Sequence, residues 1–402
     1  SWPHCANVAC SWTPARRRSR TRRARRSTKR FTDTIASRSA GSPNTTRREN
    51  APRAAAEHPA LAQSDAASQR QGRLRGCPRT DTERHMYLVC GEALFDVFIQ
   101  SDGARSNELA FKAIAGGSPF SVALGMRRMG ADSALFTGIS SDSLGQRLRQ
   151  VLRDEGVSDA YLIASDAPTT LAMVGVDAAG SPQYSFRGEG CADRLLLSEH
   201  LPTLDTQVRG LHVGSFSLVV EPVASTLLAL VQREHQRRLI SLDPNVRLGP
   251  APDVALWRER VEAFASHAHL IKVSEEDLQL LYPEREPQQV AAGWLNERCQ
   301  LVFLTQGSAG ASVHCRHGHW SAPAVPVHTR DTVGAGDTFQ AALLSYLARH
   351  DLDSPEALKT LDRATIDDML RLAIEAAALT CSRVGPDLPY LHELDRHHLA
   401  AR

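Results

Sequence analysis

The feature that most constrains the fold is an alternation of strand and helix patterns that begins near Met86. Short apolar runs predict buried strands at 87–92, where the strand ends near Phe95 and Asp96, and at 133–137, 210–213, 239–242, 269–273 and 301–305. Between them, apolar residues at helical spacing predict helices at 118–129, 144–155 and 222–238. Because parallel strands need helical crossovers, the alternation predicts an α/β fold, a mainly parallel sheet covered by helices on both faces.

Two segments fall outside this alternation. Residues 170–176 and 183–186, joined by the turn 177–182, predict a β-hairpin, and residues 96–114 are a further addition. Together they could form a small sheet over the strand ends, a lid built from about 96–114 and 168–190. Ligands in parallel α/β folds bind at the carboxyl ends of strands. Four polar residues are predicted to lie there: Asp96, Asp243, Lys272 and Thr305.

The most specific motif is the run 331–339, Asp-Thr-Val-Gly-Ala-Gly-Asp-Thr-Phe, which leads into an Ala- and Leu-rich predicted helix. Gly334, Ala335 and Gly336 would lie at a loop-to-helix junction, where free backbone N–H groups and the helix dipole favour an anion. Asp337 in the first turn could accept a proton from a hydroxyl group. No Gly-Lys-Ser/Thr follows, so the motif is not a Walker A loop. An anion site beside a base indicates phosphorylation of a hydroxyl.

This motif resembles the C-terminal signature of the ribokinase-like carbohydrate kinases, the PfkB family. Residues 116–123 resemble its first signature, Gly-Gly-x-x-x-Asn-x-Ala, with Ser121 in place of the asparagine. The resemblance runs from Met86 to about Leu394. It implies a ribokinase-like three-layer α/β/α sandwich with a small β-sheet lid, in a sugar kinase domain at 86–396.

The resemblance also implies the sugar contacts. Residues 91–96 look like the family's opening strand, whose terminal Asp, here Asp96, binds sugar hydroxyls. Gly116 and Gly117 would let the backbone approach the sugar. Ser121 keeps one donor and acceptor but reaches less far than asparagine. Arg187 on the hairpin is a further candidate contact, the alternative being a solvated side chain.

Nucleotide contacts follow from the same likeness. Residues 305–310 resemble the family's nucleotide loop, Thr-x-Gly-x-x-Gly, and a predicted helix at 373–381 precedes a segment that would close one side of the adenine pocket. The residues predicted to bind ATP are Thr305, Gly307, Gly310, Lys272, Thr332 and Gly385.

Metal binding rests on one carboxylate. Asp277 stands where many family members carry the Glu of Asn-x-x-Glu, which is associated with Mg²⁺ and phosphate, and Ser274 takes the place of the Asn. A structural alternative is that Ser274 caps a helix with acidic residues in its first turn. The resemblance also allows a K⁺ ion near the 334–337 loop.

The function implied is transfer of a phosphoryl group from ATP to a sugar hydroxyl, with Asp337 as general base. Segments 92–96, 117–120, 243–247 and 272–278 look most like bacterial-type fructokinases, which favours D-fructose going to fructose 6-phosphate. A kinase for 2-keto-3-deoxygluconate or another ketose is the enzymatic alternative. Ser121 and Ser274 motivate another class, a non-catalytic sugar-binding or regulatory protein. A homodimer through the lid is a family expectation.

The first 85 residues differ from the rest in charge. They hold 19 Lys and Arg against 6 Asp and Glu, whereas residues 86–402 hold 28 against 39. With almost no apolar periodicity, residues 1–85 are expected to be disordered. They could be a transit peptide, a basic arm for nucleic acid or membrane, or the product of translation from too far upstream, which we favour. The acidic remainder argues against nucleic acid as a partner.

The cysteines and apolar runs bear on location. Eight scattered cysteines form no Cys-x-x-Cys pair, so reduced thiols and a cytoplasmic location are expected. Cys315 lies among His314, His317 and His319, which suggests zinc, but a surface hairpin at 311–320 is favoured. No apolar run approaches 18 residues, so no membrane span is predicted.

Overall fold

A computed structural model describes residues 85–100, 107–176 and 182–394. The predicted disordered segment 1–85 therefore lies, except for His85, outside the described residues, as do 101–106 of the predicted lid and most of the 177–182 turn.

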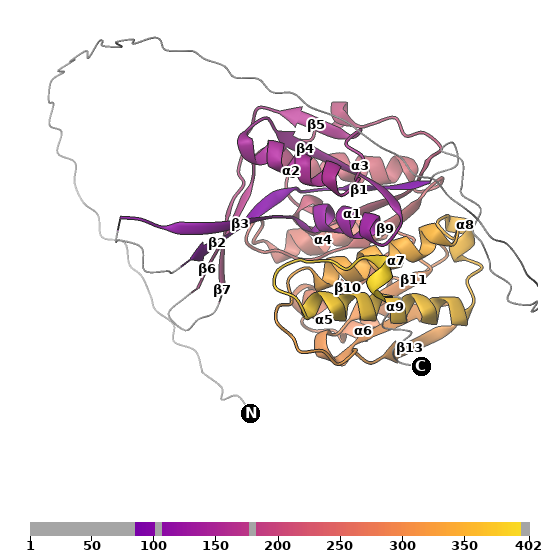
Figure 1. The fold of residues 1–402 in the computed structure, drawn as a ribbon. Helices are drawn as coiled ribbons and strands as arrows, with labels where there is room; N and C mark the ends of the chain where they lie inside the picture. Colours follow the sequence, from indigo (N-terminus) through magenta and orange to yellow (C-terminus); the bar gives the residue numbers. More distant parts are fainter. Residues whose placement is uncertain (1–84, 101–106, 177–181, 395–402) are drawn as a thin grey trace, which may run out of the picture. The chain divides into compact units, whose positions relative to one another are not determined.

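The described residues contain one large sheet with the strand order β13-β12-β11-β10-β9-β8-β1-β4-β5 (Figure 1). Every neighbouring pair from β11 to β5 is parallel, and β12 and β13 add an antiparallel hairpin at one edge. The strands are β1 (Met86–Cys90), β4 (Asp132–Ser140), β5 (Leu162–Ser165), β8 (Val208–Gly214), β9 (Leu239–Asp243), β10 (Leu270–Ser274), β11 (Leu301–Thr305), β12 (Ala311–Cys315) and β13 (Gly318–Ala322). The predicted mainly parallel sheet is confirmed.

Two hydrophobic cores lie on opposite faces of this sheet, because successive strand side chains point to opposite faces. Tyr87 and Val89 belong to one core, and Leu88 and Cys90 belong to the other. The first core is completed by α1 (Ser118–Arg128), α2 (Ser143–Asp154), α7 (Ala335–Arg349), α8 (Pro355–Leu358) and α9 (Arg363–Cys381). The second is completed by α3 (Val223–Glu234), α4 (Val254–Ala265), α5 (Glu275–Leu281) and α6 (Pro287–Gly293). The predicted three-layer α/β/α sandwich is thus confirmed.

A second, four-stranded sheet has the order β3-β2-β6-β7, also labelled in Figure 1. Its strands are β2 (Leu94–Gln100), β3 (Ala110–Gly116), β6 (Leu171–Val176) and β7 (Pro182–Arg187). β6 and β7 pair antiparallel, which confirms the predicted hairpin. The added segment contributes β2 and β3, and β2 joins the hairpin by pairing parallel with β6.

The predicted first strand is in fact two strands in two sheets. β1 stays in the large sheet, and after residues 91–93 the chain enters the small sheet as β2. Gly91 permits this break: its φ is +139°, and a Cβ atom there would come within 2.6 Å of the Pro119 ring. Asp96 therefore lies inside β2 of the small sheet and not at the end of a large-sheet strand.

Other elements differ in extent or were not predicted. The structure adds β5, α4, α6 and α8, and α9 begins at Arg363, ten residues before the predicted start of that helix. The hairpin at 311–320 is only half superficial, since β12 is buried and β13 is largely exposed. Within the described ranges, no group of three His, Cys, Asp or Glu residues could hold a metal ion, and no helix is long and apolar enough to cross a membrane.

Candidate active site

The predicted anion site lies at the start of α7. Gly334 is its N-cap, with the left-handed φ of +82°, and the Thr338 amide donates to the Gly334 carbonyl (2.8 Å). The Ala335 amide donates weakly to the Thr332 carbonyl at 3.3 Å. The Gly334 and Gly336 amides find no acceptor among the described residues. Two of the three predicted amides are therefore free to bind an anion.

Asp337 stands in the first turn of α7, half-buried. The Ser118 hydroxyl donates to its Oδ1 over 2.6 Å. Burial raises the pKa of Asp337, while the Ser118 hydrogen bond and the charges of Lys272 and Arg247 oppose that rise. A carboxyl group with a raised pKa is a better proton acceptor than a solvated one.

Asp96 is electrostatically coupled to Asp337. Burial raises the pKa of Asp96 to about 6, the negative charge of Asp337 adds to the rise, and Arg247 opposes it. Gly116 lies against this carboxylate, because a Cβ atom at Gly116 would come within 2.4 Å of Asp96 Oδ2. The predicted sugar-binding carboxylate and the predicted base thus occupy one neighbourhood.

Gly117 and Ser121 form the opening of α1 beside these carboxylates. Gly117 is the N-cap, has a φ of +101°, and a Cβ atom there would lie 2.8 Å from the Glu92 carbonyl oxygen. The Ser121 amide donates to the Gly117 carbonyl (2.9 Å). Ser121 is buried one turn after Ser118, and its hydroxyl has no hydrogen-bond partner in the part of the chain that the structure describes.

Lys272 brings a cation to the anion site. A Cβ atom at Gly336 would be 2.9 Å from Lys272 Nζ, so glycine is what allows the ammonium group this close. On its other side Nζ pairs with Asp243 Oδ2 at 2.8 Å, and both side chains are buried. Burial raises the pKa of Asp243, and the charge of Lys272 opposes that rise. Asp243 fixes Lys272 beside the first turn of α7.

The predicted nucleotide loop follows β11. Thr305 ends that strand in register with Ser274 of β10, two residues after Lys272. Gly307 and Gly310 flank a short turn with φ values of +53° and +101°. A Cβ atom at Gly310 would come within 2.2 Å of the Ala322 carbonyl oxygen, so this turn packs directly on β13.

Asp331 connects the signature loop to the segment after α9. Its Oδ1 accepts from the Val333 amide (3.0 Å) and its Oδ2 from the Gly385 amide (2.8 Å). Gly385 is thereby held beside the 331–339 loop, and its role as a nucleotide contact stays a prediction. Thr332 in the same loop is exposed.

Asp277 has a structural role in the first turn of α5. Ser274 caps this helix by accepting from the Asp277 amide (3.0 Å), which confirms the structural alternative for Ser274. Asp277 Oδ1 accepts from the Val246 amide at 2.9 Å. Asp277 therefore holds the loop that carries Arg247, and its role at a metal stays a prediction.

Two residues were missed by reasoning from the sequence. They are Ser118, which bonds to Asp337, and Arg247, whose charge lowers the pKa of both Asp96 and Asp337. The predicted Arg187, in contrast, is exposed at the end of β7 and contacts neither carboxylate among the described residues. Arg187 as a sugar contact stays a prediction. Ser118 directly follows the Gly-Gly pair, and Arg247 ends the 243–247 stretch, so both lay inside motifs already recognised.

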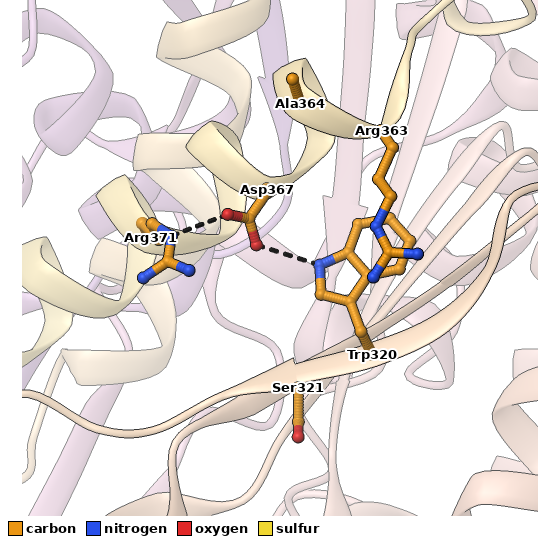
Figure 2. A pocket seen from close by; sticks show the side chains of 6 residues that line it. All are labelled: Trp320, Ser321, Arg363, Ala364, Asp367 and Arg371. Carbon is orange, nitrogen blue, oxygen red and sulfur yellow. Dashed lines mark hydrogen bonds and ion pairs between the residues drawn. The ribbon is translucent and has the colours of Figure 1, made fainter.

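A surface pocket between β13 and α9 lies away from these residues. Figure 2 shows Trp320 donating to Asp367 (3.1 Å), Arg371 paired with the same carboxylate (2.7 Å), and Arg363 over the indole ring. Arg371 is ten residues, about 15 Å along the helix, from Cys381, whose carbonyl accepts the Asp331 amide. In this pocket the single carboxylate, Asp367, is already bound by Arg371 and Trp320, so the pocket lacks the free base of the Asp337 site.

The family model of the pfkB family carbohydrate kinases matches residues 84–393. The chain belongs to this family. Fructokinase from Rhizobium leguminosarum bv. trifolii is 34% identical over 317 residues, which are 79% of this chain and 91% of that protein. The pfkB match and this likeness make the protein a carbohydrate kinase.

Solved structures of pfkB-type kinases agree. Fructokinase from Xylella fastidiosa with bound ATP has a TM-score of 0.72 and 26% identity, covering 79% of this chain and 98% of that one. A double mutant of Vibrio cholerae O395 fructokinase, with fructose, ADP and potassium ion bound, has a TM-score of 0.68 and 25% identity, covering 79% and 99%. These neighbours share the ribokinase-like sandwich with the present chain.

Proposed function

We propose that this protein transfers the γ-phosphoryl group of ATP to a primary hydroxyl of D-fructose, giving fructose 6-phosphate. The observation that carries the proposal is the first turn of α7. There the Asp337 carboxylate, free backbone amides and the Lys272 ammonium group occupy adjacent positions. Base, anion site and cation are the three groups that in-line phosphoryl transfer to a hydroxyl uses.

Asp337 is the general base in this proposal. Oδ1 is held by Ser118, and Oδ2 makes no hydrogen bond within the described residues. Oδ2 takes the hydroxyl proton as the sugar oxygen bonds to the γ-phosphorus and the bond from that phosphorus to the bridging oxygen of ADP breaks. The raised pKa of Asp337 favours this proton transfer.

Charge on the transferring group is met by Lys272 and the Gly334 and Gly336 amides. These donors are fixed before the reaction, because Asp243 anchors Lys272 and the helix fixes the amides. Prearranged donors of this kind need no reorganisation as negative charge moves. The Ala335 amide, also predicted here, would add to the site by releasing its weak bond to Thr332.

Asp96, Gly116, Gly117 and Ser121 are the proposed sugar contacts. Fructose is favoured by the likeness to the Rhizobium fructokinase and by the fructose named in the Vibrio cholerae structure. The unpartnered Ser121 hydroxyl and the Asp96 carboxylate could both bond sugar hydroxyls. A kinase for 2-keto-3-deoxygluconate or another ketose would use the same residues.

Mg²⁺ is proposed beside the ATP phosphates. Asp277 fits as a contact to the ion or to its water, because its second carboxylate oxygen has no hydrogen bond among the described residues. When bound, Mg²⁺ would neutralise the polyphosphate charge. Bound K⁺ is named for the Vibrio cholerae relative, and we propose the same cation here.

The small sheet is the proposed lid and dimer surface. Leu109, just before β3, Phe111 in β3 and Ile99 in β2 are each about half exposed. Large apolar side chains on one exposed sheet suit contact with a second copy. A closed lid would exclude water from the phosphoryl group and limit ATP hydrolysis. A cytoplasmic location stays a prediction.

The test is coupled-assay ATP turnover by the full chain with fructose, 2-keto-3-deoxygluconate, ribose and glucose. We expect fructose-dependent turnover that falls at least 1,000-fold in Asp337→Asn, because that variant has no base. Turnover with another sugar would move the substrate and keep the mechanism. Sugar binding without turnover in the wild type would favour the non-catalytic alternative.

A further inference from the structure

We propose that Ser118 is a positioning residue for the base: its hydroxyl holds Asp337 Oδ1, so that Oδ2 faces the acceptor hydroxyl. The inference rests on the proposed function of Asp337 and adds a residue to it. Ser118 is separated from Asp337 by 219 residues and reaches it across the junction of α1 and α7, two helices that pack together.

The geometry allows Ser118 one role toward the carboxylate. An ionised carboxylate only accepts hydrogen bonds, so the Ser118 hydroxyl is the donor, and the Oγ to Oδ1 distance is 2.6 Å. Among the described residues, no other group is hydrogen-bonded to the Asp337 carboxylate. The carboxylate plane is thus fixed through a single bond, whose loss would let Asp337 rotate.

Ser118 is itself held in place. It is the first residue of α1, only 8% exposed, and it follows an N-cap, Gly117, that has no side chain to cap the helix. The Glu92 side chain lies against Gly117 and accepts from the Ser217 hydroxyl (2.5 Å). Burial at the start of α1 therefore limits the movement of the Ser118 side chain.

The hydrogen bond has an electrostatic consequence for catalysis. Donation to the charged carboxylate stabilises it, and of the influences that lower the pKa of Asp337 this bond is the largest. A base must be ionised to act, so activity falls as the pH drops through its pKa. Without Ser118 the pKa would rise, and the acidic limb of the pH profile would move to higher pH.

Other charged groups also face Asp337, and their contribution is common to every variant compared. They are Lys272 on β10, Asp243 at the end of β9, Arg247 after β9, Glu92 between β1 and β2, and Asp96 on β2. None of them is altered by a change at Ser118.

The test compares pH profiles of kcat for the wild type and Ser118→Ala, with ATP and the sugar that supports turnover. We expect kcat to fall about 10- to 100-fold because the base is misaligned. The midpoint of the acidic limb should move to higher pH by about one unit. Ser118→Thr, which keeps the hydroxyl, should restore both. If Ser118→Ala does not fold, Ser118→Cys, with its weak donor, takes its place.

Ser133→Ala is the matched control. Ser133 is also buried and its hydroxyl donates to α1, at the Ala123 carbonyl (2.8 Å), but it does not contact Asp337. We expect this variant to keep the wild-type profile. An unshifted acidic limb in Ser118→Ala would overturn the inference, and so would an equal loss of kcat in Ser133→Ala.

The inference and the proposed function fail in different ways. A ¹³C NMR titration of the Asp337 carboxyl group in wild type and Ser118→Ala needs no turnover, and we expect the higher pKa in the variant. Wild-type turnover that survives Asp337→Asn would overturn the role of the base, and the positioning role with it. Turnover lost in Asp337→Asn but unchanged in Ser118→Ala would overturn the positioning role alone.

Discussion

At the scale of single residues, the buried pair of Lys272 and Asp243 combines two roles that can be separated. Lys272→Met removes the cation beside Gly336 and leaves Asp243 buried without its partner. We expect kcat to fall about 100-fold and the free energy of unfolding to fall by about 3–5 kcal/mol. The double variant Lys272→Met/Asp243→Asn should recover most of the stability and none of the rate.

Denaturant unfolding and coupled-assay kinetics measure the two effects. Arg371→Met supplies the matched control, since it breaks a surface ion pair with Asp367 in which the Arg371 side chain is 59% exposed, and it should leave both stability and kcat nearly unchanged. Recovery of kcat together with stability in the double variant would show that Lys272 is structural only.

Single residues also show what the spacing of a sequence motif can and cannot predict about the site. The nearness of Asp337 to the turn at Gly334 was predictable because the proposed base and the turn that exposes the amides lie in one nine-residue run. Ser118 and Arg247 were not, because each meets Asp337 only when distant segments pack together. Local pattern identifies a motif, and long-range packing decides which side chains it meets.

At the scale of elements, the strand and helix alternation predicted the large sheet and failed where one apolar run serves two sheets. Gly91 and Glu92 interrupt the apolar run directly after Cys90, but apolar residues resume at 93–95, so the two strands could be mistaken for one. The early turns of α9 were missed because charged residues such as Asp367, Asp368 and Arg371 dilute its apolar face.

The small sheet should position Asp96 through the contact of β2 with β3. Gly116→Ala would place a methyl group within 2.4 Å of Asp96 Oδ2 and displace the carboxylate. We expect the KM for the sugar to rise about tenfold or more, with the KM for ATP unchanged. Gly175→Ala on β6 is the control, because its Cβ atom would meet only Ile99 at 3.6 Å. Steady-state kinetics with each substrate varied would measure both constants, and an unchanged sugar KM in Gly116→Ala would contradict the proposed contact.

At the scale of the whole molecule, the free energy of unfolding should depend on pH because of buried carboxyl groups. Burial raises the pKa of Asp193 to about 7, with Glu92 adding to the rise and Thr170 and Arg194 opposing it. Its unfolded pKa is near 4, so between pH 4 and 7 the folded state binds more protons than the unfolded state. The stability that Asp193 contributes is therefore present at low pH, falls as the pH rises towards 7, and is flat above it.

The unfolding free energy of the wild type will not show this pH dependence by itself, because buried histidines make stability change with pH in the opposite direction. Burial lowers the pKa of His212 and His269 to about 3, so these two residues destabilise the folded state as the pH drops below 6.5. The difference in unfolding free energy between wild type and Asp193→Asn cancels them. We expect it to fall with a slope of up to about 1.4 kcal/mol per pH unit between pH 4 and 7. Urea unfolding at each pH measures it, and a difference independent of pH would mean that Asp193 is ionised throughout, held so by Arg194.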